Sequence, residues 1–62
     1  MNKIDFKALR EDYGYTQVQV SEITGLTVAA ISRIDNKKTV PSLETAFKYL
    51  NALNLTLEIK TL

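Results

Sequence analysis

An all-α fold of four short helices, followed by one short C-terminal β-strand, is predicted for this chain of 62 residues. Four successive stretches carry apolar residues at helical spacing, and each has a capping residue, a glycine or an asparagine at its ends. The last stretch changes to a two-residue alternation of apolar and polar residues, which is typical of a half-buried strand. We expect residues 1–54 to form one helical domain and residues 55–62 to form a dimerisation strand.

The composition restricts the possible functions. The chain has no cysteine and no histidine, so disulfides, thiolate or imidazole metal sites and the usual nucleophile and base pairs of hydrolases are excluded. We therefore expect no catalytic residue, no metal and no cofactor. The net charge of +1 is too small to indicate nucleic-acid binding by itself. A domain this short buries only about 60% of its unfolded surface, so we expect support from a partner.

The N-terminal stretch contains no apolar run that could serve as a signal peptide or a membrane span. Instead it is rich in charged residues, namely Lys3, Asp5, Lys7, Arg10, Glu11 and Asp12. We expect a cytoplasmic protein without membrane contact.

The first helix is expected to begin near Ile4 or Asp5 and to end at Gly14, a typical C-terminal stop. Its apolar stripe, which we expect to face the core, consists of Phe6, Leu9 and Tyr13.

The second helix is expected to begin at Thr16, because a threonine followed three residues later by Gln19 is the pattern of a capping box. Val20 and Ile23 give it some apolar character, and Gly25 is expected to end it.

The third helix is expected between Thr27, a plausible N-cap, and Asn36. One face would carry Thr27 with Ile31 and Ile34 and pack on the core. The other face carries small and hydrogen-bonding side chains plus one arginine, namely Ala29, Ser32, Arg33 and Asn36. Two helices joined by a tight turn indicate a helix-turn-helix, whose second helix enters the DNA major groove. The outward face suits close approach to a groove.

The fourth helix is expected to begin after Ser42, which can cap it, and to end at Asn54 in a left-handed conformation. Lys37 and Lys38 form a polar exit from the third helix and would flank the DNA groove, and Val40 precedes Pro41 and should be extended. The expected apolar stripe of the fourth helix is Leu43, Ala46, Phe47, Leu50 and Leu53.

The alternating C-terminal stretch needs a partner strand, and no other stretch of the chain is a clear strand. The same strand from a second copy, paired about a two-fold axis, is the simplest partner. The residues expected to dimerise are Leu55, Leu57 and Ile59.

Taken together, these features resemble the XRE/Cro family of phage-repressor-like helix-turn-helix proteins, over Phe6 to about Leu53. The resemblance rests on Leu9-Arg10, Gly14, Thr16-Gln17, Gly25-Leu26-Thr27, Ile31-Ser32-Arg33-Ile34 and Pro41-Ser42-Leu43-Glu44-Thr45. It implies a lambda-repressor-like fold that binds double-stranded DNA as a symmetric dimer.

The resemblance also implies roles for individual residues. Gln17 would contact a phosphate, and Val28, Ala29, Ser32 and Arg33 would face the bases. The full set of candidate DNA-binding residues is Thr16, Gln17, Thr27, Val28, Ala29, Ser32, Arg33, Asn36, Lys37 and Lys38. A structural salt bridge between Arg10 and Asp35 would join the first helix to the end of the third.

The chain departs from the family pattern at three positions. Ser21 stands where the family usually has alanine, Thr24 where it has an apolar residue, and Lys37 where it often has glycine. We therefore expect either a rotated second helix or an exposed Ile23, and a left-handed Asn36 in place of the glycine.

The C-terminal stretch is similar to that of HipB-type antitoxins, which repress their own operon and bind a kinase-like toxin. The resulting hypothesis is a repressor that binds a palindromic operator as a homodimer and has a kinase-like toxin as its protein partner. A stand-alone phage-type or controller repressor is one alternative. A protein-interaction module that has lost DNA binding is another, and Val18 and Ile23 would be candidates for a partner surface if they are exposed.

Overall fold

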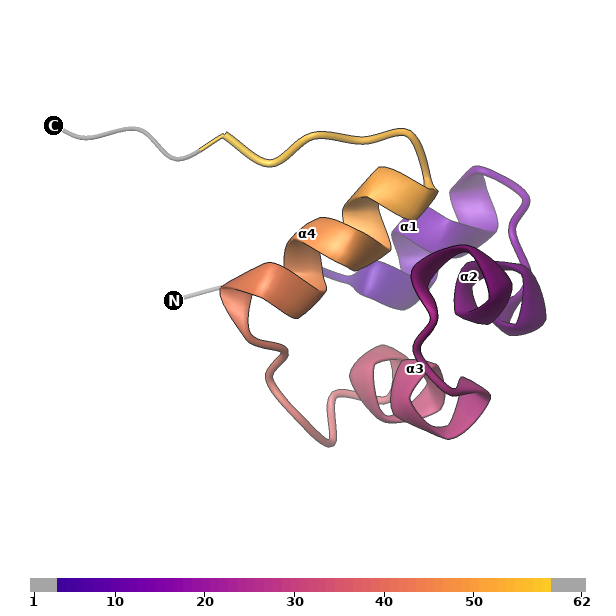
Figure 1. Cartoon of the computed structure of the whole chain (residues 1–62), viewed down its shortest axis with the longest axis vertical. Helices are drawn as coiled ribbons and strands as arrows, with labels where there is room; N and C mark the ends of the chain where they lie inside the picture. Colours follow the sequence, from indigo (N-terminus) through magenta and orange to yellow (C-terminus); the bar gives the residue numbers. More distant parts are fainter. Residues whose placement is uncertain (1–3, 59–62) are drawn as a thin grey trace, which may run out of the picture.

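The computed structural model describes residues 4–58, and they contain four α-helices. These are α1 (Phe6–Asp12), α2 (Gln17–Thr24), α3 (Val28–Asp35) and α4 (Leu43–Ala52). Helix α2 packs against both α3 and α4, and α1 packs against α3. In Figure 1, α2 and α3 follow each other through a short connection, and a longer loop leads from α3 to α4. The all-helical architecture with a helix-turn-helix is therefore as predicted.

Each helix begins at a residue whose side-chain oxygen accepts a hydrogen bond from the backbone N–H three residues later. The four caps and the N–H groups they accept from are Asp5 with Ala8 (3.0 Å), Thr16 with Gln19 (3.0 Å), Thr27 with Ala30 (3.1 Å) and Ser42 with Thr45 (3.2 Å). Thr16 also completes the predicted capping box, since its backbone N–H donates to Oε1 of Gln19 at 2.8 Å. The helix starts therefore follow from local sequence.

The helices end where the chain turns through a left-handed residue. Gly14 (φ 78°) follows α1, Gly25 (φ 80°) follows α2, and Asn54 (φ 63°) follows α4, as expected. After α3, however, the left-handed residue is Lys37 (φ 58°), whereas Asn36 has φ −91°. The expectation of a left-handed Asn36 is therefore wrong.

Hydrogen bonding explains the left-handed lysine. The N–H of Lys37 donates to the carbonyl of Ile34 at 3.1 Å, and the N–H of Lys38 donates to that of Arg33 at 2.9 Å. These two bonds form a Schellman motif. The motif satisfies the last carbonyls of α3 and requires a positive φ at the residue after the C-cap, which is Lys37. Position 37 is thus left-handed whatever side chain it carries, and a non-glycine residue there is strained by about 1 kcal/mol.

The core is formed by buried residues from all four helices and the end of α4. They are Phe6, Val20, Ile31, Ile34, Ala46, Tyr49, Leu50, Ala52 and Leu53. Three residues expected in the core are exposed instead: Thr27, Tyr13 and Leu43. The buried residues of α1 are Phe6 and Arg10, about one turn apart, and Tyr13 is not among them. Leu43 is the first residue of α4 and is 52% exposed.

Polar residues replace apolar ones in the turn between α2 and α3. The Ser21 hydroxyl donates to the carbonyl of Leu26 at 2.5 Å. Thr24 donates to the carbonyl of Val20 at 2.7 Å and accepts from the N–H of Leu26 at 3.1 Å. Both family departures in α2 therefore serve the turn, and Ile23, which they leave outside, is 58% exposed.

The predicted C-terminal strand is not present within the described residues, and residues 55–58 are irregular. The N–H of Leu55 donates to the carbonyl of Leu50 at 2.9 Å and closes α4. Leu55 and Leu57 are half-buried and pack against the core of their own chain. Figure 1 shows this segment, in yellow, turning back after α4. The apolar residues of the alternating stretch, Leu55 and Leu57, thus pack on the helices. Residues 4–58 contain no strand that could pair with this stretch. Ile59 lies outside the described residues.

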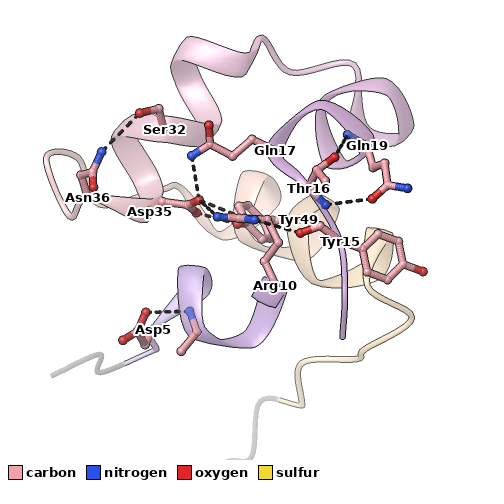
Figure 2. Close-up of polar contacts among 11 residues, drawn as sticks. Asp5, Arg10, Tyr15, Thr16, Gln17, Gln19, Ser32, Asp35, Asn36 and Tyr49 are labelled. Carbon is pink, nitrogen blue, oxygen red and sulfur yellow. Dashed lines mark hydrogen bonds and ion pairs between the residues drawn. The ribbon is translucent and has the colours of Figure 1, made fainter. Parts of the chain in front are cut away.

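A buried carboxylate joins all four helices (Figure 2). Asp35 Oδ2 accepts from Nε of Arg10 at 3.0 Å and from Nε2 of Gln17 at 3.1 Å, and Nη2 of Arg10 lies 2.9 Å from the same oxygen in an ion pair. Asp35 Oδ1 accepts from the Tyr49 hydroxyl at 2.6 Å. The Arg10 Nη1 group also donates to the carbonyl of Tyr15 at 2.8 Å. Arg10 and Asp35, the pair expected to form a salt bridge, are thus in direct contact.

The charges in this cluster support one another. Burial alone would lower the pKa of Arg10, but the hydrogen bonds and charge of Asp35 outweigh that effect and raise it. Burial and the neighbouring carboxylate raise the pKa of Tyr49, so its hydroxyl keeps its proton and donates. Every buried polar side-chain atom in the described residues has a hydrogen-bond partner.

Replacing Arg10 with methionine should lower the free energy of unfolding by about 3 kcal/mol, because it leaves the Asp35 charge buried without its cation. In a domain of this size that loss corresponds to more than ~10 °C in the thermal midpoint. Lys48→Met is the matched control, since Lys48 pairs with Glu44 at 3.8 Å on the exposed side of α4 and should contribute little. Equal midpoints for the two variants would show that the buried pair does not stabilise the fold.

Candidate nucleic-acid interface

Helix α3 has one buried and one exposed side. Ile31, Ile34 and Asp35 point inward, with exposed fractions of 0%, 5% and 6%. The first two fill the core and Asp35 forms the carboxylate cluster, so the helix is held both by apolar packing and by charged hydrogen bonds. The orientation of the opposite side is therefore fixed.

The opposite side of α3 presents short side chains and one long cation. Ala29 and Arg33 are exposed, and Val28 is 41% exposed. Ser32 is half-buried and accepts a hydrogen bond from Nδ2 of exposed Asn36 at 3.2 Å (Figure 2). The side chain of Arg33 forms no hydrogen bond or ion pair with any residue in 4–58. This side of α3 thus presents the free guanidinium of Arg33, the hydrogen-bonded pair of Ser32 and Asn36, and the short apolar side chains of Val28 and Ala29.

Two candidate residues are the N-caps of the helices. Thr16 and Thr27 are exposed, and their hydroxyl oxygens accept the capping hydrogen bonds. A hydroxyl that accepts still has its own hydrogen to donate. Both can therefore donate to a phosphate without uncapping their helices.

The side chain of Gln17 points partly into the fold and is not a fully exposed surface glutamine. It is half-buried, and one N–H of its side-chain amide donates to Asp35. This bond links the first turn of α2 to the last turn of α3 and leaves the second N–H and the amide oxygen of Gln17 for another partner. The N-terminus of α2 also has unbonded backbone N–H groups, which favour an anion.

The net charge of +1 conceals an uneven distribution. From Ile23 to Leu43 the chain has three exposed cations, Arg33, Lys37 and Lys38, and its single carboxylate there, Asp35, is buried against Arg10. All other acidic residues lie outside this stretch. Helix α3 and the loop after it therefore carry three exposed cations and no exposed carboxylate, and we call them the positive surface, which suits a polyanion.

The sequence prediction missed Tyr49. It lies in register with Ala46, Leu50 and Leu53 on the buried side of α4, and its exposed fraction is 0%. A tyrosine at a core position needs a partner for its hydroxyl. The sequence also indicated that Asp35 forms a salt bridge within the fold. An acidic residue placed there could accept from the hydroxyl of a buried tyrosine, and this was the signal that could have predicted a contact between Tyr49 and Asp35.

Within residues 4–58, no three histidine, cysteine or acidic residues are grouped so that they could hold a metal ion. In that part of the chain, no helix has both the length and the apolar character needed to cross a membrane.

Comparison with known proteins agrees with this geometry. The family model described as helix-turn-helix matches residues 6–60. Comparisons with curated proteins and with solved structures give no match. The matched region covers α1 to α4, including the turn between α2 and α3 and the positive surface of α3. The chain therefore belongs to the XRE-type helix-turn-helix family of sequence-specific DNA-binding regulators.

Proposed function

We propose that this protein is a transcriptional repressor that binds a palindromic operator as a homodimer, with α3 in the major groove. The observation that supports the proposal best is the two-sided α3. One side is fixed in the core, and the other carries Arg33 between small residues. A helix with short outward side chains can approach base edges closely, and positive residues at its end can contact the phosphates on either side of the groove.

Arg33 is the candidate with the most specific chemistry. An exposed guanidinium without an internal partner can donate two parallel hydrogen bonds to O6 and N7 of guanine. Val28 and Ala29 can contact thymine methyl groups but supply no side-chain hydrogen bonds. Ser32 and Asn36 already bond to each other, which restricts their geometry. Direct contacts to bases are thus few, and the shape of the DNA should contribute to specificity.

Selection from random duplex DNA at near-physiological salt should enrich a palindrome whose half-sites lie roughly 34 Å apart, one helical turn.

Arg33→Gln should weaken binding by about 1–3 kcal/mol and relax the preference at one base position in each half-site. Lys48→Gln on α4 is the matched loss of charge and should leave both unchanged. No enrichment by the unaltered protein would contradict operator binding, and the protein-interaction alternative would then be favoured.

Lys37 provides a second test, because its strain and its charge act in opposite directions. Lys37→Gly should raise the free energy of unfolding by about 1 kcal/mol by removing the strained side chain. It should also weaken DNA binding and reduce the slope of log K against log salt by about 0.9, if the ammonium contacts one phosphate. Lys38→Ala should reduce the slope equally without stabilising the fold. An unchanged slope for Lys37→Gly would exclude the phosphate contact.

We propose further that the homodimer forms through the C-terminal segment. Residues 55–58 turn back along the helices after Asn54 (Figure 1) and form no strand with the described part of the chain. A backbone edge of this kind can pair with a second copy. Leu55 and Leu57 would then anchor the paired segment to the helices, because their side chains pack against the core.

Leu57→Asp should give a monomeric mass in sedimentation equilibrium, because a charge at a half-buried position that packs on the core would release the segment from the helices and from its partner. Leu43→Asp is the control, an exposed apolar residue at the start of α4. Circular dichroism at the same concentration separates loss of pairing from unfolding. A folded Leu57→Asp protein that keeps a dimeric mass would exclude this route to dimerisation.

Within this class of regulators we propose the antitoxin role, with a kinase-like toxin as protein partner. The proposal rests on the resemblance of residues 54–59 to the C-terminal stretch of HipB-type antitoxins. Val18 and Ile23 on α2, apolar and 54% and 58% exposed, are the candidate residues for the contact with the toxin. A kinase-like reading frame beside the gene would favour the antitoxin role, and its absence would favour a stand-alone repressor.

A further inference from the structure

We propose that Tyr49 is a positioning residue for DNA binding: its hydroxyl sets the rotation of the Asp35 carboxylate, which in turn aims the Gln17 amide at a phosphate. The inference rests on the proposed function, because it requires DNA at the N-terminus of α2. Tyr49 itself touches no DNA, since it is completely buried on α4. Its effect has to pass through Asp35 and Gln17.

The hydrogen bonds on Asp35 are divided unequally between its two oxygens. An arginine and a carboxylate that pair through two hydrogen bonds usually use both carboxylate oxygens. Here Nε and Nη2 of Arg10 both contact Oδ2, at 3.0 and 2.9 Å. Oδ1 accepts from the Tyr49 hydroxyl at 2.6 Å. Tyr49 therefore holds the oxygen that Arg10 would otherwise take, and this fixes the rotation of the carboxylate.

The same rotation places Oδ2 where Gln17 can reach it. Nε2 of Gln17 donates one hydrogen to Oδ2 at 3.1 Å, as Figure 2 shows. Because the amide group is planar, that bond also fixes the direction of the second N–H. A glutamine held in this way binds a phosphate without first losing its rotamer freedom, and the adjacent helix N-terminus attracts the same anion.

The tyrosine ring cannot move to compensate for a change in this arrangement. Its exposed fraction is 0%, and it packs on Phe6 with ring centroids 4.9 Å apart and planes tilted by 58°. Tyr49→Phe keeps this packing and removes only the hydroxyl. Arg10 should then bond both oxygens of Asp35, so that Oδ2 turns away and Gln17 loses its anchor.

The test is a double-mutant cycle on DNA binding, using the duplex selected above. Tyr49→Phe should weaken binding about fivefold in the otherwise unaltered protein, the cost of ordering one free glutamine side chain on binding. In a Gln17→Ala background the same change should have almost no effect, since there is no amide left to position. An equal loss in both backgrounds would show a general structural role and overturn the proposal, as would undiminished binding by Tyr49→Phe alone.

A second readout requires no DNA and no second variant. In the unaltered protein, one side-chain N–H of Gln17 should exchange with water more slowly than those of Gln19, an exposed residue that bonds through its oxygen. Tyr49→Phe should remove that difference. Fast exchange of both Gln17 hydrogens in the unaltered protein would overturn the positioning role, even if Tyr49→Phe does not fold. A protein that binds no duplex but shows the slow hydrogen would contradict the proposed function and leave the internal geometry supported.

Discussion

The structure depends on one buried carboxylate. Asp35 lies at the end of α3, and its two oxygens accept hydrogen bonds from side chains of α1, α2 and α4. A buried charge is tolerated only when such partners surround it, and the loss of a single partner is costly. The geometry is correspondingly specific, because the three other helices must each bring a donor to one point. In a domain this small, a fully hydrogen-bonded polar cluster restricts how the helices can pack together.

The same cluster connects the core with the surface proposed for DNA. The proposed function requires a rigid α3, because its short side chains would lie against base edges, and the inner side of α3 is held by apolar contacts and by Asp35. Gln17 belongs to both regions, since its amide bonds to Asp35 while its backbone opens α2. Positive charge is kept on the same surface because the one carboxylate of α3 is turned inward and paired. The same residue, Asp35, therefore holds the helices together and supports the surface proposed for DNA.

Strain is accepted where the proposed function needs a charge. The turn after α3 requires a left-handed residue, and the chain has Lys37 there, whereas Gly14 and Gly25 occupy the corresponding places after α1 and α2. The hydrogen bonds to the last carbonyls of α3 are formed in spite of the side chain. A lysine at this position lengthens the positive surface beyond the helix. The lysine at position 37 thus strains the backbone and supplies a positive charge for the proposed DNA contact.

The sequence by itself determined the helix starts, most of the helix ends and the side of α3 that faces outward. Caps such as Thr16 and Gly25 act through bonds to residues three or four positions away, so the information is local. Only the tertiary structure decided that Tyr49 and Gln17 both donate hydrogen bonds to Asp35. It also decided that Leu55 and Leu57 pack against the helices of the same chain. An alternating pattern shows that one side of a segment is buried, but the surface that buries it depends on contacts between residues distant in the chain.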